Sequence, residues 1–168
     1  MTAPAPGAQP WANVYSDVIS ASKVGGHSYA GFWIRAVAYL IDSFVIGIPV
    51  LIIYVVILQG SGADFSTMDA ATTTQYVRIF QLLNFAAEFG YFVTFWTLGS
   101  TIGMRLVGIR VADESTFETV GVGKAMLRFL GFVVSGAICG LGFLRVAWNP
   151  DKQGLHDRMA GTVVIWRK

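Results

Sequence analysis

The sequence predicts an all-α membrane protein with two transmembrane helices, a third hydrophobic segment that re-enters or spans the membrane, and a short cytoplasmic β-ribbon. Hydrophobic residues make up 54% of its 168 residues and charged residues 13%, and the mean hydropathy is +0.58. This composition is too apolar for an ordinary soluble domain. The basic residues flank the apolar segments, as orientation signals do, so we expect no nucleic-acid partner.

The chain divides into a tail over residues 1–26 and a transmembrane domain over residues 27–168. The tail is rich in Ala, Pro, Gly and Ser, a composition that predicts a flexible segment. It lacks a basic cluster followed by an apolar run, so we do not expect a cleavable signal peptide.

The first span is predicted over residues 32–58, and it carries Arg35 and Asp42 inside an apolar run. A charged side chain at membrane depth costs at least roughly 2.5 to 3.5 kcal/mol, so it needs a compensating partner. The two residues are about 10 Å apart along a helix axis, too far for a direct ion pair. Each therefore needs a further partner. Pro49 predicts a kink near Val45.

The second span is predicted over residues 76–98, and its polar residues recur at helical spacing. They are Arg78, Gln81, Asn84 and Glu88. This intramembrane polar stripe must face protein or water, because lipid cannot satisfy it. Asp42 and Glu88 fall at similar depth, so we expect them to titrate as a coupled pair. A hydrogen-bonded helix contact without substrate is the alternative.

A cytoplasmic segment with Arg105 and Arg110 follows the second span. Its MRLVGIRVAD stretch and the C-terminal TVVIWRK are rich in β-branched residues, which predicts two strands paired as a ribbon at the membrane face. For the first stretch, an amphipathic interfacial helix is the competing prediction.

The third hydrophobic region covers residues 125–148. Basic residues lie on both sides of it, so both flanks are expected in the cytoplasm. A re-entrant hairpin that turns within SGAICGLG is favoured, and a single helix with close-packed glycines is the alternative. Both termini and Arg105 are then cytoplasmic, and Asp64 lies outside. Cys139 is expected to be a small core residue, and a single cysteine excludes an internal disulfide.

Three motifs occur in order: GFWIRAVAYLIDSF, TLGSTIGMRLVGIRV and GLHDRMAGTVVI. Over residues 30–166 the chain resembles the RDD family of small membrane proteins. The resemblance implies that Arg35 is the family's arginine, Asp42 its first aspartate and Asp157 its second. Arg35 begins its helix at the cytoplasmic boundary, on the same side as Asp157, so we predict an ion pair between these two.

No HExxH, GxSxG or P-loop motif is present, so we expect neither catalysis nor a cofactor or metal. His156 is expected to be a structural histidine. We expect a multi-pass plasma-membrane protein that is an accessory or scaffolding component of a membrane assembly. An oligomeric transporter of ions or small solutes, such as a sodium/proton antiporter, is the alternative that the resemblance implies. The expected partners are the lipid bilayer and other membrane subunits or further copies of the chain.

Overall fold

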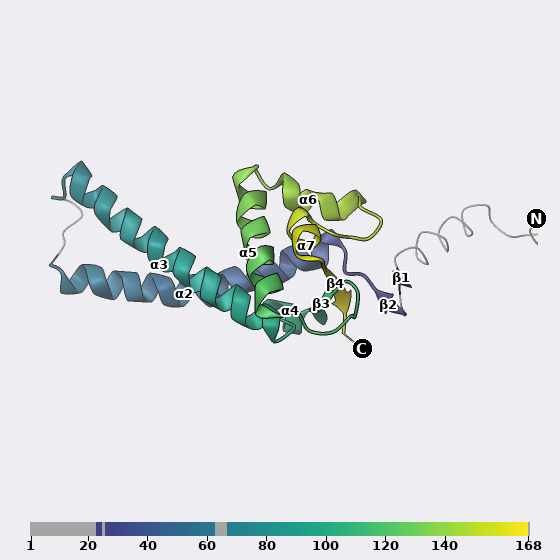
Figure 1. Cartoon of the computed structure of the whole chain (residues 1–168). Coiled ribbons are helices and arrows are strands. Elements are labelled where there is room, and N and C mark those ends of the chain that lie inside the picture. Colours follow the sequence, from purple (N-terminus) through teal and green to yellow (C-terminus); the bar gives the residue numbers. More distant parts are fainter. Residues whose placement is uncertain (1–22, 25, 63–66, 168) are drawn as a thin grey trace, which may run out of the picture.

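A long antiparallel hairpin of two helices forms one end of the molecule, and a compact group of shorter elements forms the other (Figure 1). The computed structural model describes residues 23–24, 26–62 and 67–167. The tail predicted for residues 1–26 therefore lies mostly outside the described residues, as do Asp64 and Lys168. The hairpin consists of α2 (Phe32–Gly60) and α3 (Ala70–Thr97). Asp69 caps α3 by accepting a hydrogen bond from the Thr72 amide at 2.9 Å.

The first predicted span is confirmed as α2, a continuous helix that includes Pro49. Within the described part of the chain, α2 is the one helix that is by itself long and apolar enough to cross a membrane, with a mean hydropathy of 2.6. Large apolar side chains in the C-terminal half of α2 are exposed, among them Ile52 and Val56. The predicted number of transmembrane helices is not confirmed, because α3 carries the polar stripe and does not meet the same criterion.

The third hydrophobic region is broken into two helices. α5 (Val122–Ala137) and α6 (Leu141–Trp148) meet at an angle of 102°, and Cys139 and Gly140 have positive φ values of 56° and 78°. The predicted turn within SGAICGLG is confirmed, whereas its entry into a membrane stays a prediction. The expectation that Cys139 is a core residue is wrong, since it is exposed at the turn.

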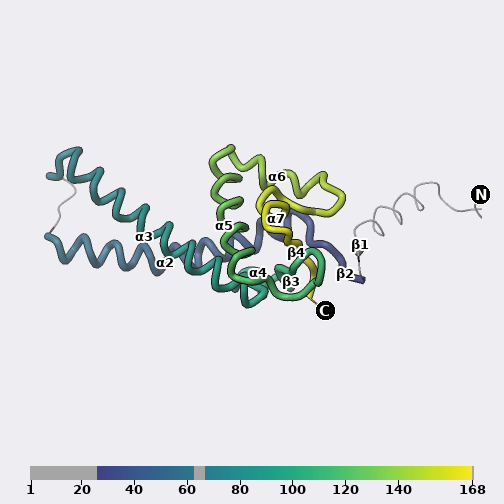
Figure 2. Tube along the Cα trace, viewed as in Figure 1, coloured from purple at the N-terminus to yellow at the C-terminus, as the bar shows by residue number. Residues whose placement is uncertain are grey.

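The predicted β-ribbon is confirmed. β3 (Ile109–Asp113) pairs antiparallel with β4 (Thr162–Trp166), with Ile109 opposite Trp166. The competing helix is limited to the short α4 (Ile102–Leu106) before the strand. β4 follows α7 (Leu155–Ala160), which packs against α5. The tube in Figure 2 shows α4, α6, α7 and the ribbon gathered around the N-terminal part of α2.

A second short hairpin lies where the chain enters the domain. β1 (Lys23–Val24) pairs with β2 (His27–Ser28), and Tyr29 bridges to Ile165 of β4. The domain boundary expected after residue 26 falls within this hairpin.

Aromatic packing joins the helical hairpin to the compact end. Phe92 and Trp96 of α3 contact Phe132 of α5, and Tyr39 of α2 contacts both Phe92 and Phe132. Trp96 is completely buried. Aromatic pairs of this kind add roughly 0.5 to 1.5 kcal/mol each beyond the area they bury. The cluster fixes α2, α3 and α5 around one core, beside which the charged residues lie.

Candidate functional site

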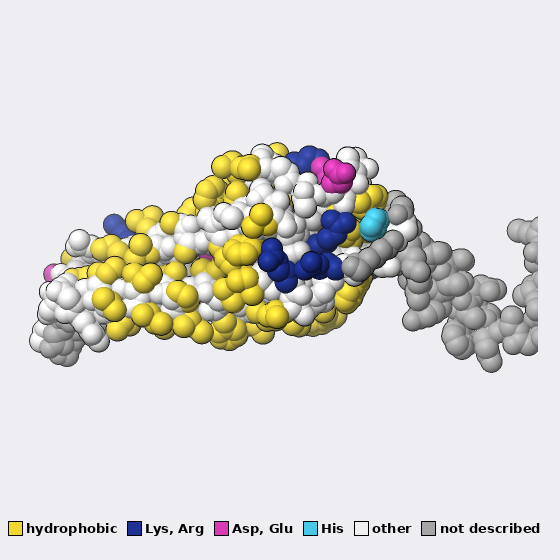
Figure 3. Space-filling model, turned by 90° about the horizontal axis from the view of Figure 1, so that it is seen from below, with side chains coloured by type: hydrophobic (Ala, Val, Ile, Leu, Met, Phe, Trp, Pro, Cys, Tyr) yellow, Lys and Arg dark blue, Asp and Glu magenta, His cyan; other side chains and the backbone are white. Residues whose placement is uncertain are grey.

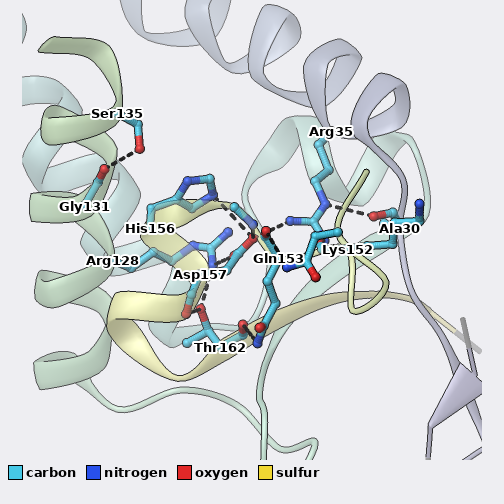
Figure 4. Close-up of polar contacts among 12 residues, drawn as sticks. Ala30, Arg35, Arg128, Gly131, Ser135, Lys152, Gln153, His156, Asp157 and Thr162 are labelled. Carbon is cyan, nitrogen blue, oxygen red and sulfur yellow. Dashed lines mark hydrogen bonds and ion pairs between the residues drawn. The ribbon is translucent and has the colours of Figure 1, made fainter. Parts of the chain in front are cut away.

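The predicted ion pair between Arg35 and Asp157 is confirmed. Nη1 of Arg35 donates to Oδ2 of Asp157 at 2.6 Å, and both side chains are almost completely buried. The remaining guanidinium nitrogens donate to backbone carbonyls, Nε to Ala30 at 3.0 Å and Nη2 to Lys152 at 2.6 Å. Figure 4 shows Arg35 at the centre of these contacts. Every nitrogen of the guanidinium thus has an acceptor, which offsets the cost of its burial.

A second arginine that sequence reasoning did not assign to the site also binds Asp157. Nη1 of Arg128 on α5 forms an ion pair with Oδ1 of Asp157 and donates to the Thr162 hydroxyl at 2.7 Å. Its guanidinium lies 4.9 Å from the ring centroid of Trp96, a cation–π arrangement. The signal was present, because Arg128 is a charged residue inside an apolar helix, as Arg35 is. We define Arg35, Arg128 and Asp157 as the charge triad.

Asp157 therefore joins three helices. Its Oδ2 also accepts from the Gly154 amide at 2.9 Å, which caps α7. Burial by itself would raise the pKa of this carboxyl, but Arg128 and Arg35 outweigh burial and hold the pKa well below its ordinary value. Asp157 is thus a carboxylate at neutral pH. The charge triad ties α7 to α2 and α5.

His156 lies beside the triad and has no hydrogen-bond partner on either ring nitrogen among the described residues. Burial lowers its pKa to about 3, and the two arginines act in the same direction, against Asp157. The ring is therefore neutral at pH 7. It packs against Phe132 and Phe143. This environment agrees with a structural role.

Asp42 is the centre of a second cluster. Its Oδ1 accepts from the Tyr91 hydroxyl at 2.6 Å and the Gly103 amide at 2.7 Å, and its Oδ2 accepts from the Thr101 hydroxyl at 2.6 Å. The side chain is completely buried and forms no ion pair with a described residue. Asp42 thereby connects α2 to α3 and to the start of α4. We call these four residues the Asp42 cluster.

Glycine is required at position 103 because α4 approaches α2 closely there. A Cβ atom on Gly103 would collide with the carbonyl of Ala38 and would lie 3.0 Å from the Asp42 carboxyl carbon. Tyr91 and Thr101 also complete the helix start, because the Tyr91 hydroxyl accepts from the Ile102 amide and the Thr101 hydroxyl from the Met104 amide. Sequence reasoning did not identify Tyr91 or Thr101 as partners.

Within the described part of the chain, the four residues of the polar stripe on α3 form no hydrogen bond or ion pair with the charge triad or the Asp42 cluster. Arg78 and Gln81 are exposed, whereas Asn84 and Glu88 are half-buried. Asn84 donates to Glu88 at 2.8 Å within the same helix. Asp42 and Glu88 have different hydrogen-bond partners, so their titration as a pair stays a prediction.

The sequence of the chain matches a known protein family and several known proteins. The model of the RDD family matches residues 29–161, which includes Arg35, Asp42 and Asp157. The chain belongs to the RDD family.

The relatives of this RDD protein include two from Bacillus subtilis (strain 168). The uncharacterized protein YxaI is 30% identical over 82% of this chain and 97% of its own length. The uncharacterized membrane protein YteJ is 31% identical over 84% of each chain. A Mycobacterium tuberculosis (strain ATCC 25618 / H37Rv) protein named proline-rich antigen homolog is 33% identical over 41% of this chain and 29% of its own. No solved structure matches the chain.

Family membership and the apolar α2 support the membrane location predicted from the sequence. The orientation of the termini stays a prediction.

Proposed function

We propose that this RDD protein is a non-catalytic accessory or scaffolding component of a plasma-membrane assembly, without a cofactor of its own. The observation that carries the proposal is the saturation of the family's charges. The guanidinium of Arg35 uses all three nitrogens, and both oxygens of Asp42 and of Asp157 accept hydrogen bonds. A group that transports an ion must exchange its partners, whereas these partners belong to the fold.

The outer surface offers what a partner subunit would need. Arg78 and Gln81 are exposed on α3, one turn apart, among exposed apolar residues such as Val77 and Leu82. Arg78 lies near the end of the predicted span, where a long arginine side chain can reach the interface, so its cost facing lipid is smaller than at the bilayer centre. Covering this face with another membrane protein, or with a second copy of the chain, would remove that cost.

Co-purification tests the proposal. The full chain is extracted in a mild detergent, and the membrane proteins that accompany it are identified by mass spectrometry. Replacing Arg78 and Gln81 by alanine should release the partner without lowering the melting temperature, because neither side chain is buried. Arg158→Ala removes an exposed arginine on α7 and is the control. Retention of the partner by the double variant would reject this face as the interface.

The alternative is an oligomeric transporter of ions or small solutes, such as a sodium/proton antiporter. One observation favours it: Asp42 is completely buried and receives hydrogen bonds only from neutral donors. In this alternative Asp42 is the group that binds the transported ion. Proteoliposomes should then show a pH-dependent cation flux that Asp42→Asn or Glu88→Gln abolishes in a folded protein. Absence of flux in the unmodified chain would reject this alternative.

A further inference from the structure

A groove at the open end of the β-ribbon is separate from both buried clusters. It has a volume of about 390 Å³ and is lined by His27, Arg110, Trp166 and Arg167. Figure 3 shows basic side chains gathered on this side of the molecule, beside a broad apolar surface. These residues come from β2, from β3 and from the end of β4. The groove therefore forms only where the β1–β2 hairpin packs against the ribbon of β3 and β4.

The positive charges in the groove are not neutralised by the described part of the chain. Arg110 donates from Nη2 to the carbonyl of Phe117 at 2.9 Å, and neither Arg110 nor Arg167 forms an ion pair there. Asp113, an acid on the same strand as Arg110, is already paired with Lys124. Two guanidiniums thus retain free donors in one groove, and such forked donors suit the oxygens of a phosphate group.

The groove is built on a fixed frame. His27 stacks on Phe117 with ring centroids 4.8 Å apart, and the Phe117 carbonyl holds Arg110. The amide of Arg167 donates to the Gly108 carbonyl at 2.8 Å, which continues the ribbon past β4. Backbone pairing therefore fixes the positions from which the two arginine side chains extend into the groove.

The surroundings select a lipid over a soluble anion. Trp166, which lines the groove, is 43% exposed. An exposed tryptophan beside arginines is typical of the bilayer interface. Basic pockets on the cytoplasmic side of membrane proteins bind anionic headgroups.

We propose that this groove binds the phosphate headgroup of an anionic phospholipid. Arg110 and Arg167 hold the phosphate, while Trp166 borders the acyl chains. This site requires neither an accessory role nor transport, so it is independent of the proposed function.

Native mass spectrometry of the full chain in detergent tests the proposal, with titration of phosphatidylglycerol and of phosphatidylcholine. We expect one phosphatidylglycerol to bind preferentially. Arg110→Gln together with Arg167→Gln should weaken its binding by about 25-fold, on the basis of about fivefold for each basic residue near an anionic surface. The control is Arg145→Gln with Arg158→Gln, which lowers the net charge equally on α6 and α7 and should leave binding unchanged.

Three results would overturn the proposal. Equal affinity for phosphatidylcholine would show that charge is not recognised, and equal weakening in the control would show a general effect of net charge. Displacement of the lipid by glycerol phosphate at equimolar concentration would assign the groove to a soluble phosphate compound. The melting temperature of each variant is measured in parallel. If Arg110→Gln folds poorly, Arg110→Lys is the second variant: it keeps the charge but loses the forked donors, so its binding should lie between that of the unmodified chain and that of Arg110→Gln.

Discussion

Removing one member of the charge triad should cost far more than removing an exposed charge. Asp157 is completely buried and neutralises two arginines, so Asp157→Ala leaves both guanidiniums buried without a carboxylate. Removal of one partner of a buried pair typically costs roughly 3 to 5 kcal/mol. Arg35→Ala should fall in this range, because it leaves Asp157 with one arginine and strands two carbonyls. Asp157→Ala should cost at least as much.

The double variant isolates the interaction. Once Asp157 is absent, Arg35 has lost its carboxylate, so its removal should cost clearly less than in the unmodified protein. Residues that share a buried pair usually have interaction energies of about 0.5 to 3 kcal/mol. The double variant should therefore be destabilised by less than the sum of the two single variants.

The free energy of unfolding in a mild detergent, measured by denaturant titration, provides the assay. The matched comparison is Arg35→Ala combined with Asp42→Ala, since Arg35 and Asp42 lie on one helix but belong to different clusters. That pair should be additive within about 0.5 kcal/mol. Additivity of Arg35→Ala with Asp157→Ala would refute the assignment of the ion pair, and so would equal non-additivity in both pairs.

The remaining predictions concern pH, backbone packing and topology. The pKa of His156 is lowered to about 3 in the folded protein, whereas the ordinary pKa of histidine is about 6.5. The folded state therefore binds fewer protons than the unfolded state between these two values. Its stability should be complete above about pH 6.5 and should fall as the pH is lowered towards 3, by at most about 1.4 kcal/mol per pH unit. The melting temperature should fall less steeply in His156→Gln over pH 7 to 5, and identical slopes would contradict this reasoning. Gly103→Ala should lower the melting temperature strongly, because the added Cβ would collide with the backbone carbonyl of Ala38. Gly47→Ala should be neutral or stabilising, because no atom lies within 4 Å of the added Cβ. Equal effects of the two substitutions would argue against the close approach of α4 to α2. In a cysteine-free background, an impermeant thiol reagent applied to intact cells should label a cysteine at Ser66 and leave one at Lys168 unlabelled, and labelling at Lys168 would replace the re-entrant segment by a full span.

Local patterns predicted much of the fold. The first apolar run, the break within SGAICGLG and the two β-branched stretches each depend on neighbouring residues, and each appears in the structure as expected. The second predicted span corresponds to α3. Its helix forms, but its polar residues keep it from being as apolar as α2.

The charged residues show where sequence reasoning succeeds and where it stops. The high cost of burying Arg35 and Asp42 showed that each needed a partner, and placement on the same side of the membrane singled out Asp157 for Arg35. Tyr91 and Thr101 gave no comparable signal, because a hydroxyl group tolerates many environments. Arg128 is the case where a sequence signal exists, because a charged residue inside an apolar helix needs a partner just as Arg35 does.

The amino-acid sequence alone shows that Arg35 and Asp42 each need polar partners, because an uncompensated charge in an apolar environment is too costly to retain. Which residues serve as those partners depends on how the helices pack. Arg35 and Arg128 converge on Asp157 because α5 and α7 pack closely enough that a Cβ on Gly131 would lie 2.7 Å from the Cα of His156. Asp42 reaches the start of α4 because Gly103 lets two backbones touch. Such approaches depend on residues that are distant in the chain, and local sequence patterns carry no record of them.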